Sequence, residues 1–426
     1  MSRKSIVIAS SLATKGIEVK FLKDLIEQRG HKTILLDLCV SWDSMEMEPL
    51  IPADITCEEV AKAAGTSIQE LKASQKRGEI PVTITKGAIK KAKELYEAGK
   101  LDGIVGLGGA TNTTVATEIM KALPFGVPKL MVSSTAAIPR YAGRYIGSAD
   151  ITMMASVVDM VGLNELVKSV LTRAAGTISG MVETGAGSVL ALLKQSEKPL
   201  IAVTEFGYAE KCCEHYVKPY LEEKGYEVIM IHAQGVGDRA LEKLLDQGIF
   251  DGVVDIVPAG VSEELLGGNR AAGPDRLEGA GRRGIPQVVT PCGFEMISCG
   301  PLERRDKGDP LWVSRNLANR KYYVHDLLRV QARTSADELR LVAKTVANKL
   351  NKAKGPVKFL IPLRGWSALS IEDWALHDPE TDKVLTEELR KHLKPEIEIK
   401  EFDVHINTPE FARAVVEAFD EMMKSS

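Results

Sequence analysis

The chain contains one strand–helix–strand plan twice, and this duplication limits its possible folds more than any other feature. Three pairs of segments match in the same order: 4–37 with 198–232, 101–109 with 250–260, and 126–134 with 284–292. In the first pair, an apolar run, a glycine-containing turn, an amphipathic stretch and a second apolar run follow one another in both copies. The repeat predicts an α/β protein of two Rossmann-like parallel-sheet subdomains, with a ligand cleft between them at the strand carboxyl ends.

The length of 426 residues exceeds what one hydrophobic core usually supports, so the duplication favours two domains. We expect them at 1–194 and 195–426, with an insertion at 41–77 that has no counterpart in the second copy. A TIM barrel also alternates strands and helices, but it would show eight similar units.

Composition excludes several classes of protein. No apolar run approaches the ~20 residues that span a bilayer, and the N-terminal apolar run is short enough to be a first strand, so we expect no membrane partner and a cytoplasmic location. A net charge of −3 with mixed signs argues against nucleic acid as a partner. The six cysteines include no CxxC pair, so neither a disulfide framework nor a zinc knuckle is expected.

In the first copy the pattern predicts a strand at 6–9, a turn at 10–16, a helix at 17–29 and a strand at 33–37. Within the insertion, Thr56 followed by Glu59 is typical of a capping box at a helix start.

After the second copy the sequence looks irregular between 292 and 319, and a further α/β segment then begins. It predicts a helix at 335–352, a strand at 357–362, a loop containing Asp378-Pro379-Glu380, a helix at 386–392, a strand at 396–402 and a helix at 409–423.

The strongest chemical signal is the loop Gly106-Leu-Gly-Gly-Ala-Thr-Asn-Thr-Thr114, between a predicted strand and a predicted helix. Its glycines allow close backbone approach, and the helix start adds partial positive charge, so phosphate or carboxylate could bind there. The loop is neither a Walker A motif nor GxGxxG. The alternative is a tight strand–helix turn with threonine caps.

Two neighbouring turns could converge on the same ligand. The turn at 10–16 offers hydroxyls and a cation from Lys15, and Ser133, Ser134 and Thr135 follow the next strand. Asp37 ends the second strand, where a Rossmann-type fold often has a ribose-binding acid. A solvated turn residue is the alternative for Asp37.

The second copy carries acid–base candidates at its strand ends. Glu205 and His232 end its first two strands, and a lone histidine at such a place is often only hydrogen-bonded structure. Further candidates are Glu295, His325 and His405, and alternation would place Asp403, His405 and Asn407 on one face of an extended stretch. No metal site follows from these spacings, and no Ser-His-Asp order or G-x-S-x-G elbow is present.

Several of these motifs together resemble the Tm-one-like ATP-binding domain family, which includes the N-terminal half of the tomato mosaic virus resistance protein. The resemblance covers essentially the whole chain. The motifs are Thr14-Lys15-Gly16, the 106–114 loop, Val127–Ser134, Asp150–Met154, Asp159–Asn164, His232–Gly237, the 267–289 segment, Asp378-Pro379-Glu380 and His405-Ile406-Asn407.

The resemblance implies ATP with magnesium bound by the first copy, and self-association as a homodimer. The residues that match the family's ATP site are Thr14, Lys15, Gly108, Gly109, Thr111, Thr113 and Ser133; our wider candidate set adds Gly16, Asp37, Asn112 and Ser134. The chain also departs from the family pattern. Ala13 replaces an aspartate, Pro258–Val261 and Cys292–Gly300 replace characteristic runs, and Asp326 follows His325 where the family has asparagine.

Three hypotheses follow for function. The first is an ATP- or phosphate-binding protein, for which enzymatic activity is left open. The second is a hydrolase or lyase of small oxo-acids or cyclic ketones, assisted by a divalent metal such as zinc or manganese and using Glu205, His232, Glu295, His325 and His405. The third is a non-catalytic interaction protein that ATP stabilises.

Overall fold

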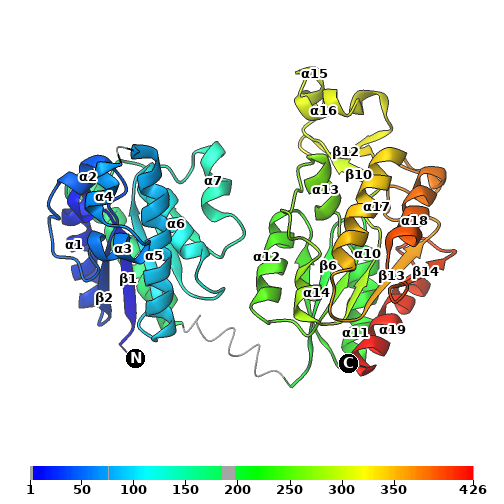
Figure 1. Ribbon diagram of the computed structural model, residues 1–426, viewed down its shortest axis with the longest axis horizontal. Coiled ribbons are helices and arrows are strands. Elements are labelled where there is room, and N and C mark those ends of the chain that lie inside the picture. The colour runs from blue at the N-terminus through cyan, green and yellow to red at the C-terminus, as the bar shows by residue number, and fades with distance from the viewer. Residues whose placement is uncertain (1–2, 75, 185–196, 426) are drawn as a thin grey trace. The chain divides into compact units, whose positions relative to one another are not determined.

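In a computed structural model the chain divides into two compact units, Met1–Leu192 and Leu193–Ser426 (Figure 1). The structure describes residues 3–74, 76–184 and 197–425. The predicted domain junction at 194–195 lies outside these residues. The predicted ligand cleft between the two copies also stays a prediction.

The first unit is a five-stranded parallel sheet covered by helices on both faces. Its elements are β1 (Ser5–Ser10), α1 (Leu12–Gln28), β2 (Lys32–Asp37), α2 (Trp42–Glu46), α3 (Cys57–Ala63), α4 (Ile68–Ala73), η1 (Arg77–Glu79), α5 (Ile80–Glu97), β3 (Gly103–Gly108), α6 (Ala110–Lys121), β4 (Lys129–Ser133), α7 (Pro139–Ile146), β5 (Thr152–Ala155) and α8 (Glu165–Glu183). The strand order is β2-β1-β3-β4-β5. Alternate strand residues face opposite ways, so one core packs on α1 and α8 and the other on α3, α5 and α6.

The second unit has a six-stranded parallel sheet and a small antiparallel one. Its elements are β6 (Leu200–Glu205), α10 (Glu210–Cys212), the π-helical turn η3 (Cys213–Val217), α11 (Lys218–Glu223), β7 (Glu227–His232), α12 (Val236–Asp246), β8 (Gly252–Asp255), α13 (Gly260–Leu266), α14 (Gly279–Arg283), β9 (Gln287–Val289), β10 (Met296–Ser298), α15 (Glu303–Asp306), α16 (Pro310–Ser314), η4 (Leu317–Asn319), β11 (Tyr322–Val324), β12 (Val330–Arg333), α17 (Ala336–Leu350), β13 (Val357–Pro362), α18 (Pro379–His392), β14 (Glu398–Phe402) and α19 (Pro409–Ser425). The larger sheet has the order β14-β13-β9-β8-β6-β7.

The predicted fold class is confirmed, and the duplication extends to individual contacts. The order β2-β1-β3-β4 of the first sheet recurs as β7-β6-β8-β9 in the second. In the first copy the carboxylate of Asp102 accepts the N–H of Ser5 at 2.8 Å, and in the second the carboxylate of Asp251 accepts the N–H of Leu200 at the same distance. Each aspartate therefore fixes the start of the central strand.

Four local predictions were wrong. Helix α1 begins at Leu12, because the carboxylate of Asp37 accepts the Leu12 N–H and satisfies its first turn. The segment expected to be irregular contains β10, which pairs with β12 and β11 in an antiparallel sheet. Helix α18 begins at Pro379, after the N-cap Asp378 whose side chain accepts the Thr381 N–H, so Pro379 and Glu380 lie in the helix and not in a loop. Residues 403–407 form bends after β14 and are not an extended stretch.

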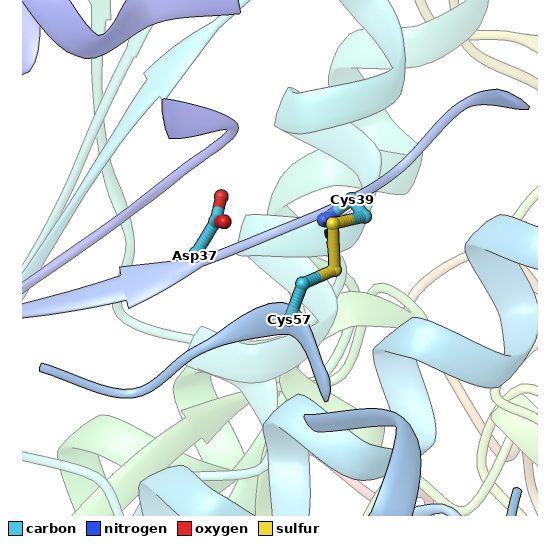
Figure 2. A group of neighbouring side chains, drawn as sticks. All are labelled: Asp37, Cys39 and Cys57. Atoms are coloured by element: carbon cyan, nitrogen blue, oxygen red, sulfur yellow. Dashed lines mark hydrogen bonds between the residues drawn. A yellow bond between two sulfur atoms is a disulfide. The ribbon is translucent and has the colours of Figure 1, made fainter. Parts of the chain in front are cut away.

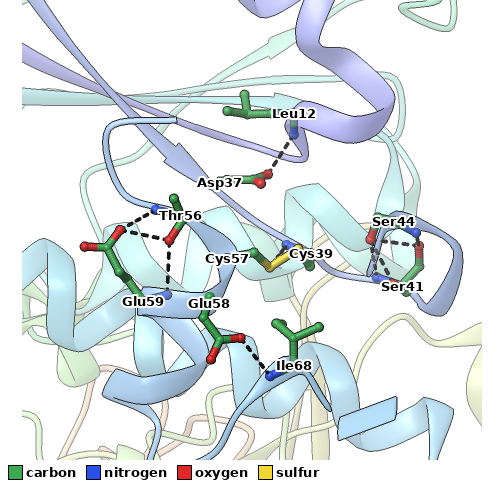
Figure 3. The surroundings of a disulfide bond; sticks show 10 residues. All are labelled: Leu12, Asp37, Cys39, Ser41, Ser44, Thr56, Cys57, Glu58, Glu59 and Ile68. Carbon is green, nitrogen blue, oxygen red and sulfur yellow. Dashed lines mark hydrogen bonds between the residues drawn. A yellow bond between two sulfur atoms is a disulfide. The ribbon is translucent and has the colours of Figure 1, made fainter. Parts of the chain in front are cut away.

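A fifth expectation, that the cysteines form no disulfide framework, is corrected by a disulfide between Cys39 and Cys57 (Figure 3). The insertion folds back on the end of β2 through a bridge between Leu36 and Ile55, and this brings the two Cα atoms to 5.8 Å. The Thr56–Glu59 capping box in the same segment is confirmed. No helix in the described part of the chain has the length and apolar character needed to cross a membrane.

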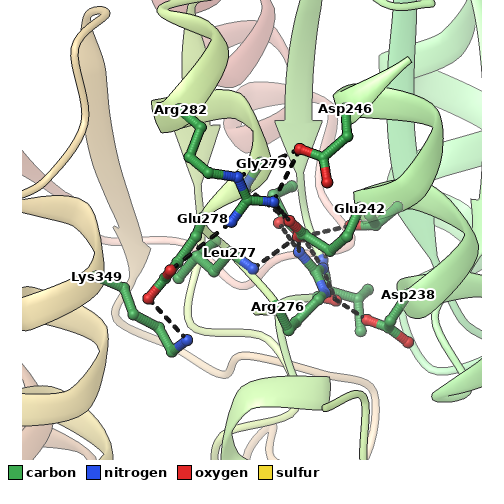
Figure 4. A network of polar contacts seen from close by, with 12 residues as sticks. Asp238, Glu242, Asp246, Arg276, Leu277, Glu278, Gly279, Arg282 and Lys349 are labelled. Atoms are coloured by element: carbon green, nitrogen blue, oxygen red, sulfur yellow. Dashed lines mark hydrogen bonds and ion pairs between the residues drawn. The ribbon is translucent and has the colours of Figure 1, made fainter. Parts of the chain in front are cut away.

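Arg276 joins three buried carboxylates of the second unit into one network (Figure 4). Its Nη1 and Nη2 donate to the two oxygens of Asp255 at 2.6 and 2.7 Å, and its Nε donates to Asp238 at 2.6 Å. Glu242 lies 3.6 Å away and accepts the N–H groups of Leu277 and Gly279. All three acidic side chains are buried, and the Arg276 guanidinium is the buried cation that pairs with them.

Replacing Arg276 tests this network. Arg276→Met should lower the unfolding free energy of the second unit by about 3–5 kcal/mol, because it leaves buried carboxylates without their cation. Arg340, which is 47% exposed and pairs with Asp337 on the surface, provides the control. Arg340→Met should cost less than about 1 kcal/mol in the same urea titration, and equal losses for the two variants would contradict the account.

Candidate functional site

The carboxyl ends of β1 and β3 form the centre of the candidate site in the first unit. The chain crosses the sheet in opposite directions on either side of this pair, and ligands of doubly wound sheets bind at such a reversal. The Ser10 hydroxyl donates to the Leu107 carbonyl at 2.8 Å, and the Asn112 amide donates to the same carbonyl at 3.3 Å. The first bond joins the ends of the two strands, and the second holds the first turn of α6 against the end of β3.

The two glycines at the end of β3 differ in whether a side chain would fit in their place. Gly108 has a φ of +155°, and a Cβ there would lie 2.5 Å from the Cβ of Asn112, so only glycine fits. Gly109 has a φ of −83° and is the N-cap of α6, and the nearest atom to its Cβ would be Ser134 Oγ at 3.8 Å. Space is therefore open beside Gly109, where the first turn of α6 begins without a side-chain cap.

The first turn of α1 contains Thr14, Lys15 and Gly16, which we expected in a loop. Thr14 is exposed, and Gly16 packs against Leu50. The ammonium of Lys15 donates to the Met160 carbonyl at 2.5 Å and lies 3.7 Å from Asp159. Lys15 therefore fixes the loop before α8.

Asp37 is a buried helix cap and not a solvated turn residue. It is 3% exposed, and its Oδ1 accepts the Leu12 N–H at 2.9 Å. Burial raises the pKa of its carboxyl above the usual range.

The hydroxyls around β4 mostly satisfy one another. Ser133 Oγ lies 2.6 Å from Thr113 Oγ1, which donates to the Gly109 carbonyl at 2.8 Å. Ser134 and Thr111 are exposed. Of the predicted residues that follow β3 and β4, Gly109, Thr111 and Ser134 are therefore the accessible ones, and Gly108, Asn112, Thr113 and Ser133 shape the turn.

A cavity of about 560 Å³ opens beside the first turn of α6. Its walls come from α6, from the start of α5 and from α7; its lining residues are Pro81, Ala110, Thr111, Thr114, Thr117, Glu118, Tyr141, Arg144 and Tyr145. Sequence reasoning missed Arg144 and the two tyrosines. The one available signal was their four-residue helical spacing after Pro139, which is compatible with one helix face but says nothing of what that face contacts.

In the second unit Glu205 and His232 are in contact. They are partners in the register of β6 and β7, with Nδ1 of the histidine 2.7 Å from Oε1 of the glutamate. The matching positions of the first copy are Ser10 and Asp37, which are also register partners. His232 is 63% exposed, so its other ring nitrogen can reach a ligand.

The remaining acid–base candidates have structural partners. His325 Nδ1 lies 3.3 Å from the Tyr208 hydroxyl, and His405 Nδ1 accepts the Asn407 N–H at 3.1 Å. Burial lowers the pKa of His405, which therefore favours its neutral form. The Asn407 amide donates to the Tyr208 carbonyl, so the segments of both histidines meet at Tyr208.

Glu295 is fully buried, and its Oε2 accepts the Gly293 N–H at 2.7 Å. Burial raises the pKa of this carboxyl. Among the described residues, no three members of the Glu/His set lie close enough together to ligate one metal ion.

Each unit is a doubly wound parallel sheet with polar groups at its strand ends, so the protein has a duplicated Rossmann-like α/β fold. The N-terminal domain of the Uncharacterised protein family UPF0261 matches residues 4–186, and the C-terminal domain of that family matches residues 198–423. The chain belongs to the UPF0261 family.

Relatives are found in bacteria and in a plant. A UPF0261 protein of Clostridium tetani is 37% identical over 422 residues, covering 99% of both chains, and one of Brucella suis is 32% identical, covering 97% of this chain and 94% of the relative. The ToMV susceptible protein tm-1(GCR26) of Solanum lycopersicum is 33% identical over 328 residues, covering 76% of this chain and 42% of the tomato protein. The predicted resemblance to the tomato protein is confirmed over 76% of this chain and not over essentially all of it, and ATP binding stays a prediction.

The two glycines after β3 allow a direct test of the turn. Gly108→Ala should lower the unfolding free energy of the first unit by about 1–3 kcal/mol, because alanine must adopt a positive φ and meet Asn112. Gly109→Ala should change it by less than about 1 kcal/mol. Urea unfolding measures both, and an equal response at the two positions would contradict the distinction.

Proposed function

We propose that the first unit binds a phosphate-bearing nucleotide, ATP with magnesium by family resemblance, at the start of α6. The observation that carries this proposal is that the cavity beside the first turn of α6 also contains Arg144. A helix N-terminus attracts anions through its N–H groups and its partial positive charge, and a guanidinium forms strong charge-assisted hydrogen bonds with phosphate.

The cavity supplies further groups that a nucleotide would use. The hydroxyls of Thr111 and Thr114 are exposed on the first turns of α6. Tyr141 is 45% exposed at the cavity wall and contacts Tyr145 edge to face, which gives an aromatic surface for a base. Glu118 is the carboxylate in the lining, and it pairs with Lys121 at 2.6 Å.

The residues that line this cavity could hold magnesium only together with the phosphates of a nucleotide. Ala13 stands where the resembled family has an aspartate, and Glu118 already has a cationic partner. Magnesium usually keeps several waters and binds through one or two carboxylates together with phosphate oxygens. Phosphate oxygens would therefore be its main ligands here. We omit Asp37 from the site, because its carboxylate caps α1 and lines a different cavity.

The second copy has no comparable open space at the matching strand–helix turn, which favours the first unit as the nucleotide-binding one. The register places Asp255 where the first copy has Gly106, and Asp255 is buried against Arg276. A Cβ on Gly260, at the start of α13, would lie 2.5 Å from Ala272. The strand–helix turn after β8 is thus filled by the protein's own side chains, whereas the turn after β3 is open at Gly109.

A second candidate function rests on the Glu205–His232 contact. A carboxylate that orients an exposed imidazole is the arrangement of a general base, as the hydrolase or lyase hypothesis requires.

The proposal also includes self-association as a homodimer or higher homo-oligomer, which the resemblance implies, and a cytoplasmic location, which the composition indicates. Whether ATP is hydrolysed or only stabilises an interaction protein is left open.

Thermal unfolding with ATP and magnesium tests the proposal. At a ligand concentration 100 times Kd, binding should stabilise the first unit by about 2.7 kcal/mol, or raise its Tm by about 5–10 °C. Gly109→Val should abolish the shift, because its side chain would occupy the open space at the helix start.

Gly207→Val is the matched control, since it makes the same change in the loop after β6, where a Cβ meets nothing within 4 Å. This control should retain the shift. No shift with ATP, or an equal shift in the Gly109 variant, would contradict the proposal. A shift with zinc or manganese alone that Glu205→Gln removes would favour the second candidate.

A further inference from the structure

Asp37, Cys39 and Cys57 form a group of three metal-ligating side chains in the first unit (Figure 2). One carboxylate oxygen and the two sulfur atoms all lie within 4.8 Å of one another. The three side chains are 3%, 6% and 8% exposed. The two cysteines belong to none of the functional motifs found in the sequence. In the structure they are oxidised to a disulfide.

The fold brings the group together through backbone contacts that do not depend on the sulfur atoms. The Asp37 N–H donates to the Ile55 carbonyl at 3.0 Å, which aligns the insertion with the end of β2. Cys39 lies two residues beyond Asp37, and Cys57 two residues beyond Ile55. The Thr56–Glu59 capping box then fixes the start of α3 at Cys57. Opening the disulfide would therefore leave both thiols beside the carboxylate.

The donors also have the hydrogen bonds that orient ligands in metal sites. Asp37 Oδ1 accepts the Leu12 N–H, and a carboxylate has further lone pairs for a cation. The Cys39 N–H donates to Cys57 Sγ at 3.1 Å. Such contacts to ligating groups fix their positions and are part of the construction of metal sites.

The same three residues line a cavity of about 710 Å³, whose other walls come from residues 44–58 and Ile68. A metal bound by three protein donors at a cavity wall keeps a coordination position for water or a substrate. Ser44 and Glu58 supply polar groups to this cavity. None of its lining residues belongs to the cavity at α6, so the inference does not depend on the proposed nucleotide site.

We propose that the reduced protein binds one zinc-class divalent cation through Asp37, Cys39 and Cys57, with one coordination position open to the cavity. Two thiolates and a carboxylate suit zinc, whereas magnesium and manganese prefer oxygen ligands alone. The disulfide is the metal-free, oxidised form of the same site.

The conversion between the two forms balances with a dithiol as the reductant. Thiol–disulfide exchange transfers two electrons and two protons to the Cys39–Cys57 bond, which gives two thiols while the dithiol becomes a disulfide. Binding of Zn²⁺ then releases the two thiol protons, because the ligands are thiolates. In the reverse exchange a disulfide is the oxidant: it accepts two electrons from the two thiolates and two protons from water and becomes a dithiol, while the Cys39–Cys57 bond re-forms and Zn²⁺ is released.

The test uses cobalt(II) as a spectroscopic probe and the full-length chain. The chain is reduced with a dithiol, the reductant is removed without oxygen, and Co²⁺ is titrated in. One equivalent should produce thiolate-to-cobalt charge-transfer absorption in the near ultraviolet, which Zn²⁺ should then abolish by displacement. The oxidised protein should show no such band until it is reduced.

Three variants and a control assign the ligands. Cys39→Ser and Cys57→Ser should each weaken cobalt binding by at least about 10–100-fold, the loss typical of even an indirect contact to a metal ligand. Asp37→Asn should weaken it similarly, while its amide oxygen can still accept the Leu12 N–H and preserve the fold. Cys212→Ser, which removes a buried cysteine of the second unit, should leave the band unchanged.

The proposal fails if the reduced protein gives no charge-transfer band, if the oxidised protein binds equally well, or if Asp37→Asn binds with unchanged affinity. Urea unfolding of each variant shows whether it is folded. Should either cysteine variant unfold, the comparison of oxidised with reduced protein and the Asp37→Asn variant still decide the outcome.

Discussion

The hydrogen bonds between the ends of β1 and β3 are the contacts on which the first unit's site depends. The Ser10 hydroxyl donates to the Leu107 carbonyl and so joins the carboxyl ends of the two central strands at the point where the strand order reverses, and the Asn112 amide of α6 donates to the same carbonyl. Gly108 follows directly, and its positive φ turns the chain so that α6 starts at Ala110 with Gly109 as its N-cap. The position of the first turn of α6 at the cavity follows from this turn.

The equivalent strand positions of the second copy hold side chains of different chemistry. Glu205 and His232 replace Ser10 and Asp37, and Asp255 replaces Gly106. In the first copy the side chains of Met131 and Ala116 pack closely against Gly106, whereas in the second copy the carboxylate of Asp255 pairs with Arg276 in a buried ionic network. Duplication therefore preserved the contacts that start each central strand, at Asp102 and Asp251, while the strand ends diverged.

The fold was predictable because its signals are local or repeated. Apolar runs separated by glycine-containing turns predicted both parallel sheets, and the Thr56–Glu59 spacing predicted the start of a helix. The contact of Glu205 with His232 could be anticipated because both end neighbouring strands. The disulfide could not, since Cys39 and Cys57 meet only where the insertion folds back on β2. Arg144 was missed for a similar reason: packing of α7 on α6 brings it to the cavity, and no sequence spacing encodes that packing.

Hydrogen–deuterium exchange of the backbone amides, with and without ATP and magnesium, tests the central claim most directly. The account predicts that ATP slows exchange at residues 109–114, where uncapped N–H groups would bind phosphate, and leaves residues 205–208 and 232–237 unchanged. Slowed exchange at the ends of β6 and β7, with no change at the start of α6, would contradict it.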